Sequence, residues 1–112
     1  MNRWLVCLLA LALAVPAQAE YVSGAEILDR CLNPRSSAEA TCLGYVVGVA
    51  DSVVAYEAEA DPILKRLCIP AAATPAQLLN VVRKHLAAYP EQHGSPAQML
   101  VFNALLKAFP CR

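Results

Sequence analysis

The sequence predicts an all-α protein, a small disulfide-stapled bundle of four to five helices. Apolar residues recur with the 3.6-residue period of amphipathic helices, and no segment shows a convincing strand-like alternation. A helix-start signal, in which a hydroxyl residue is followed three positions later by Glu or Gln, occurs four times. Short segments containing proline separate these stretches, which favours antiparallel packing of neighbouring helices.

The first 19 residues have the three parts of an export signal. Arg3 gives the short amino-terminal region its positive charge, an apolar run extends from Trp4 to Val15, and Ala17-Gln18-Ala19 fits an A-x-A cleavage signal. The apolar run of about a dozen residues is too short to span a bilayer comfortably. We therefore expect residues 1–19 to be a cleaved signal peptide and residues 20–112 to form one exported, periplasmic domain that is not attached to a membrane. A retained signal anchor is the alternative.

Composition argues against a partner of strong charge. Residues 20–112 carry eight Lys and Arg and nine Asp and Glu, so their formal net charge is −1. The charges form no long run of either sign, and neither nucleic acid nor anionic lipid is an expected partner. A domain of this size has only a modest core and often needs covalent stabilisation.

The cysteines can supply that stabilisation. Cys31, Cys42, Cys68 and Cys111 remain when the leader and its Cys7 are removed. An even number of cysteines in a small exported domain predicts two disulfides. Three connectivities exist, and the sequence alone does not choose between them. We favour Cys31–Cys42, which would join neighbouring helices, and Cys68–Cys111, which would tie the C-terminal end to the middle of the chain. A zinc site is the alternative, but the chain lacks spacings such as C-x-x-C; no cofactor or metal is expected.

Each predicted helix has a local start and stop signal. Two helices begin with nearly identical stretches, T-P-A-Q and S-P-A-Q, which place a hydroxyl cap before a proline. One further helical turn is expected over residues 63–67. The four helices are predicted from Ser23 to the Asn33-Pro34 pair, from Ser36 to about Glu59, from Thr74 up to Pro90 and from Ser95 up to Pro110.

The stretch C-L-G-Y-V-V-G-V-A-D-S within the second helix contains residues that isolated helices disfavour. Each of Gly44 and Gly48 costs ~1 kcal/mol relative to alanine in an exposed helix, so we expect both to lie against another helix at the centre of the bundle. Asp51 is expected to be a half-buried carboxylate held by an arginine or a backbone N–H, and Tyr45 a core aromatic with its hydroxyl at the rim. All four are predicted to be structural, since no partner acid, base or metal ligand accompanies Asp51.

The sequence contains no recognisable catalytic site. His85, beside Arg83 and Lys84, is expected to face solvent, and His93 lies in a loop. Nucleophile-elbow, catalytic Cys–His and phosphate-binding glycine motifs are all absent. We therefore expect a binding protein and not an enzyme.

Five short motifs follow one another in order: C-x-G-Y-V-x-G-V-x-D at 42–51, C-I-P at 68–70, T-P-A-Q-L at 74–78, H-L-x-x-Y-P-E at 85–91 and A-L-L-K-A-F-P-C at 104–111. Together with the leader they resemble the Rap/Tai family of type VI secretion immunity proteins, over nearly the whole chain from Ser23 to Cys111. The resemblance implies a small helical periplasmic protein, with a homodimer as one expected state. It also implies a partner, an NlpC/P60-like peptidoglycan amidase toxin, whose active site the protein binds and occludes.

The shared motifs fit a scaffold, so we expect the toxin-binding residues in exposed charged segments. An acidic loop is suited to enter a cleft that holds a catalytic Cys–His pair and to contact its imidazolium. A solvated charged turn is the alternative in each case. The candidates are Glu57, Glu59, Asp61, Lys65 and Arg66 in the link between the second and third helices, and Glu91, Gln92 and His93 in the following loop.

Two rival functions suit a short, helical, disulfide-bonded exported protein. One is a periplasmic chaperone of the acid-stress type, which would expose apolar surface as its carboxylates are protonated at low pH. The sequence shows no cluster of carboxylates against an apolar seam that would support it. The other is a structural subunit of an envelope complex.

Overall fold

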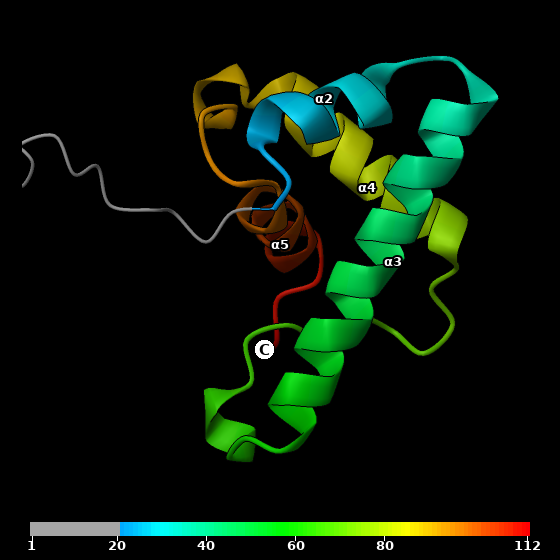
Figure 1. The fold of residues 1–112 in the computed structure, drawn as a ribbon. Helices are drawn as coiled ribbons and strands as arrows, with labels where there is room; N and C mark the ends of the chain where they lie inside the picture. The colour runs from blue at the N-terminus through cyan, green and yellow to red at the C-terminus, as the bar shows by residue number, and fades with distance from the viewer. Residues whose placement is uncertain (1–20) are drawn as a thin grey trace, which may run out of the picture.

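The computed structural model describes residues 21–112, and the predicted signal peptide lies outside this range. The described chain folds into four α-helices, α2 (Gly24–Leu32), α3 (Ser36–Ala58), α4 (Pro75–Ala88) and α5 (Ala97–Ala108), shown in Figure 1. Two short 3₁₀ turns, η1 (Pro62–Leu64) and η2 (Pro90–Gln92), follow α3 and α4. The predicted all-α bundle is therefore confirmed, and over residues 21–112 its β-structure is limited to one isolated bridge.

The four helices enclose a single apolar core. Each helix packs against the other three, and α3 is the longest of them, with a C-terminal end that extends beyond the rest of the bundle (Figure 1). Side chains from all four helices fill the interior. The largest fully buried ones are Ile27, Cys31, Cys42, Val46, Val82, Leu86, Leu100, Val101 and Leu105.

Two of the four predicted caps form. The Ser23 hydroxyl accepts from the Glu26 N–H at the start of α2. Thr74 and Gln77 form a complete capping box at the start of α4, in which each side chain accepts from the backbone N–H of the other residue.

The other two predicted caps are wrong, because backbone groups take the place of the hydroxyls. Ser36 lies inside α3, whose N-cap is Arg35, and the Arg35 carbonyl closes the first turn. At α5 the N-cap is Pro96 and not Ser95. There the N–H of Ala97 donates to a carbonyl of the segment that precedes α2 (3.1 Å).

Both favoured disulfides are present. Cys31 and Cys42 lie at the junction of α2 and α3, with Cα atoms 5.0 Å apart, and both are fully buried. Cys68 and Cys111 join the segment after η1 to the C-terminal end, with Cα atoms 4.9 Å apart. The first bridge is therefore part of the core, while the second lies near the surface, where Cys68 is exposed.

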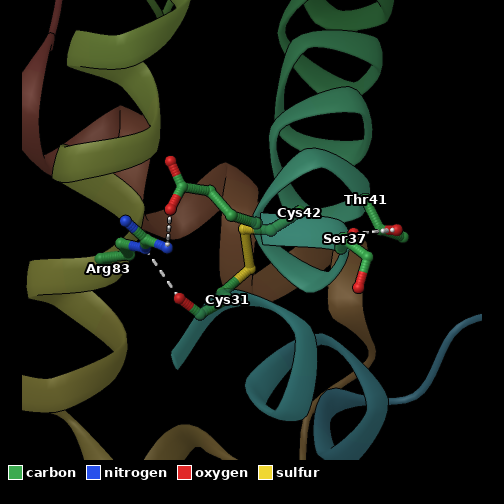
Figure 2. The surroundings of a disulfide bond; sticks show 6 residues. Cys31, Ser37, Thr41, Cys42 and Arg83 are labelled. Atoms are coloured by element: carbon green, nitrogen blue, oxygen red, sulfur yellow. Dashed lines mark hydrogen bonds and ion pairs between the residues drawn. A yellow bond between two sulfur atoms is a disulfide. The ribbon is translucent and has the colours of Figure 1, made fainter. Parts of the chain in front are cut away.

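Arg83 of α4 holds the junction of α2 and α3 from the side (Figure 2). Its Nε–H donates to the carbonyl of Cys31 (2.8 Å), one of the carbonyls that the end of α2 leaves without a helical partner. Its terminal nitrogen also pairs with the Glu39 carboxylate of α3 (3.2 Å). Because these groups are partly exposed, the ion pair itself adds little stability; the bond to Cys31 fixes how α4 meets α2.

The expected close helix contact at Gly44 and Gly48 is wrong. A Cβ atom at either position would meet nothing within 4 Å, and both residues are exposed. The inward side of α3 is formed by other residues, among them Val46 and Ala50, and the glycines lie on the outer side.

Asp51 and Tyr45 have different outcomes. Asp51 is fully on the outer side of α3, exposed and not half-buried, because it lies about 100° around the helix from the buried Ala50. Tyr45 packs against the core while partly accessible, as expected, and burial raises the pKa of its hydroxyl.

The glycine that close packing requires is Gly24, and we predict that Gly24→Ala destabilises the fold. A Cβ at Gly24 would overlap the backbone carbonyl oxygens of His93 and Ser95, which cannot move as a flexible side chain could. The free energy of unfolding should fall by ~1–3 kcal/mol, measured by urea titration followed by circular dichroism. Gly44→Ala is the control, and should leave stability unchanged or raise it by up to ~1 kcal/mol. Equal effects of the two substitutions would contradict this assignment.

Candidate functional site

The most prominent surface feature is a projection at the C-terminal end of α3, which we call the arm (residues 53–66). It comprises the end of α3, η1 and the links around η1, and it extends beyond the rest of the bundle (Figure 1). The α-helix ends at Ala58 before Asp61-Pro62, as the sequence indicates. The Asp61 carboxylate then accepts from the Ile63 N–H (3.0 Å) and begins η1.

Large apolar side chains are exposed on the arm. Tyr56 is 78% exposed, Ile63 88% and Leu64 64%, while Val54 on α3 is 49% exposed. Exposed apolar groups gathered on one projection are typical of a protein-binding surface. The charge pattern of the sequence pointed only to the charged residues of this segment. The P-I-L triplet between charged residues was the signal that could have revealed the apolar ones.

A hollow of about 360 Å³ lies between the arm and α5. Most of the residues that line it are apolar, and Glu57 and Arg66 are the charged ones. The lining residues are Val53, Tyr56, Glu57, Ala60, Leu64, Arg66 and Phe102.

Glu57 is buried, so the expectation that it lies on an exposed segment is wrong. Its carboxylate accepts hydrogen bonds from the backbone N–H groups of Arg66 (3.1 Å) and Leu67 (3.3 Å). The residue lies on the same inward side of α3 as Val46 and Ala50. Glu57 therefore holds the returning end of the arm against α3 and is not available to contact a partner directly.

The base of the arm is also tied to the C-terminal end of the chain. The Cys68–Cys111 disulfide lies there, and backbone hydrogen bonds join Cys68 N–H to the Phe109 carbonyl (2.8 Å) and Cys111 N–H to the Arg66 carbonyl (3.0 Å). The arm projects, but both of its ends are fixed to the bundle.

The remaining charged candidates of this segment are exposed. Glu59, Asp61, Lys65 and Arg66 surround the apolar residues, and over residues 21–112 none of the four takes part in a salt bridge. An apolar centre with a polar, charged rim is the usual composition of a protein interface.

The second candidate segment is committed to internal contacts. Gln92 Oε1 lies 2.8 Å from Nε2 of His85, and His93 Nε2 donates to the Leu86 carbonyl (2.7 Å). Only Glu91 of the three is fully exposed. His85 itself is buried, at 8% exposure, so the expectation that it faces solvent is wrong. These contacts fix the loop to α4 and make the arm the stronger candidate.

The outer side of α3 is a second unusual surface. By length and composition α3 alone among the described helices could cross a membrane, a weak signal that core helices of soluble proteins also give. The disulfide and core contacts of α3 are those of a core helix. Within the most apolar 18-residue stretch of α3, however, only 17% is buried. Much of the apolar surface of this helix therefore faces outward.

This architecture is that of a small helical, disulfide-bonded protein with a projecting arm that exposes apolar side chains. The chain matches the family model of the Rap1a immunity proteins over residues 23–111, and it belongs to that family. The resemblance noted in the sequence is therefore confirmed. No curated protein and no solved structure gave a significant match.

Family membership establishes the general role. Immunity proteins of this family are inhibitors without enzymatic activity that bind a toxin effector, and they are typically exported. The two disulfides also suggest an oxidising compartment.

We predict that Glu57→Gln loosens the arm. The substitution removes the negative charge, and an NH2 group, which only donates, replaces Oε2, which accepts from the Leu67 N–H (3.3 Å). The free energy of unfolding should fall by ~1–3 kcal/mol, and the Leu67 amide should exchange with deuterium faster. Glu59→Gln, on the exposed side, should stay within about 0.5 kcal/mol of the parent. Unchanged exchange at Leu67 in Glu57→Gln would refute the role given to Glu57.

Proposed function

We propose that this protein is a periplasmic immunity protein that binds a type VI secretion peptidoglycan amidase and occludes its active site with the arm. The observation that carries the proposal is the projecting arm, with its exposed apolar residues and charged rim, on a member of an immunity family. The NlpC/P60-like class of the amidase is proposed from the resemblance of the sequence motifs. Membership in an immunity family favours this role over the chaperone and structural-subunit alternatives.

The arm has a composition suited to entering a catalytic cleft. Tyr56 and Ile63 can bury apolar area against the walls of the cleft and exclude water, as central residues of tight interfaces do. The exposed carboxylate of Glu59 provides a negative charge for the imidazolium of a Cys–His pair. An arm fixed at both ends loses little conformational freedom on binding, which favours affinity.

We propose that residues 1–19 are a cleaved signal peptide and that residues 20–112 form the single mature domain. A toxin that cuts the cell wall acts outside the cytoplasm, so its inhibitor must reach the same compartment. The A-x-A signal and the two disulfides support this proposal.

Inhibition tests the function directly. We expect the oxidised protein 20–112 to inhibit peptidoglycan hydrolysis stoichiometrically when mixed with the amidase encoded beside its gene, or with one member of a panel of type VI amidases. Ile63→Asp should weaken inhibition roughly 10–100-fold, because a charge replaces an apolar contact at the end of the arm.

Met99→Asp is the matched control for that substitution. Met99 is also an exposed large apolar residue, at 45%, but it lies on α5 outside the arm. Its substitution should leave inhibition unchanged. If the parent protein inhibits no amidase, the proposed target is wrong; if both variants inhibit equally, the arm is not the binding surface.

We also propose that the mature protein forms a homodimer through the outer side of α3. The exposed apolar surface of this helix supports the proposal, and Gly44 and Gly48 would allow a second helix to approach its backbone closely.

We predict that Gly48→Leu disrupts this dimer while leaving the fold of each subunit intact. The new side chain has open space in the monomer, so the circular dichroism spectrum should not change. Sedimentation velocity should show the parent protein as a dimer and the variant shifted toward monomer at the same micromolar concentration. A monomeric parent protein would overturn the dimer proposal.

A further inference from the structure

We infer that the hollow between the arm and α5 receives one large apolar side chain of the toxin, from a residue next to an acidic one. This inference rests on the proposed function and adds a contact in which the toxin inserts a side chain into this protein. While the arm enters the toxin, a side chain of the toxin enters the hollow.

The size and walls of the hollow suit a single side chain. Its volume of about 360 Å³ is near the lower end of the range for small-ligand pockets, ~300–1,000 Å³. Val53, Ala60, Leu64 and Phe102 contribute apolar surface from α3, the arm and α5. Leucine or phenylalanine would bury apolar area against these walls.

The polar groups of the hollow favour a hydrogen-bond acceptor, such as a carboxylate, on the incoming toxin residue or on the residue beside it. Glu57 also lines the hollow, but its carboxylate oxygens accept the N–H groups of Arg66 and Leu67. The Arg66 side chain makes no hydrogen bond or salt bridge within residues 21–112, and Arg66 is exposed next to Lys65. A guanidinium presents a planar set of donors that matches a carboxylate. An acidic residue beside the apolar one therefore complements this side of the hollow.

The hollow can be tested separately from the end of the arm. Ile63 is 88% exposed and does not line the hollow, whereas Ala60 and Leu64 do. Ala60→Trp would fill the hollow with an indole ring without changing Ile63. Ala87→Trp, at an exposed position on α4 away from the arm, is the matched control.

The first experiment needs no toxin. N-acetyl-phenylalanine and its uncharged amide are titrated into ¹⁵N-labelled oxidised protein 20–112, and amide chemical shifts are followed. We expect saturable shifts at Ala60, Leu64 and Phe102, with tighter binding of the carboxylate than of the amide. Arg66→Gln should remove that difference, and Ala60→Trp should abolish binding. No saturable shift at these residues up to the solubility limit, or the same binding by Ala60→Trp, overturns the inference.

The second experiment uses an amidase that the parent protein inhibits. Ala60→Trp should weaken inhibition at least tenfold, and Ala87→Trp should not. If Ile63→Asp weakens inhibition and Ala60→Trp does not, the proposed function stands and the inference about the hollow fails. If no amidase is inhibited by the parent protein, the proposed function fails, and the titration still decides whether the hollow binds this kind of side chain.

Discussion

The carboxylate of Glu57 determines where the arm lies relative to the bundle. It is a buried charge on the inward side of α3, and a charge in such a place is costly unless hydrogen bonds satisfy it. The chain that returns from η1 satisfies it with the N–H groups of Arg66 and Leu67, which would otherwise lack partners beside the core. These hydrogen bonds therefore offset both the cost of burying the Glu57 carboxylate and the cost of removing the two N–H groups from water. This contact holds the returning end of the arm against α3, beside the point where the Cys68–Cys111 disulfide ties the same segment to the C-terminal end.

Features governed by neighbouring residues were predicted well from the sequence. The end of α3 before Asp61-Pro62 and the capping box at Thr74 depend on interactions within a few positions, and both form. The disulfide between Cys31 and Cys42 joins helices separated by a short connection, so chain topology favours it. The cap at Ser36 failed because the Arg35 carbonyl accepts the Glu39 N–H, and at Ser95 the Ala97 N–H donates to the Val22 carbonyl.

Features that depend on distant partners were predicted poorly. The α3 segment is apolar on most of its circumference, so periodicity could not decide which side is buried, and Gly44 and Gly48 were assigned to the wrong one. Arg83 and His85 belong to a charged run that suggests solvent. Their partners, the Cys31 carbonyl and Gln92, become apparent only when the chain is folded. In the candidate site, the charges of the sequence pointed to the segment from Glu57 to Arg66. The exposed Ile63 within it was missed, because an apolar residue in a link is usually taken to be buried.

The positions of the disulfides divide the chain at the arm. Cys31–Cys42 lies entirely before the arm and Cys68–Cys111 entirely after it, so neither bridge spans residues 53–66. One peptide-bond cleavage near the exposed Ile63 would therefore separate the described chain into two pieces, each closed by its own disulfide and held to the other by noncovalent contacts alone. Exposed loop tips are the places that proteases cut first. A partner seated on the arm would cover this position, so the lifetime of the intact chain among extracytoplasmic proteases would depend on whether the arm is occupied.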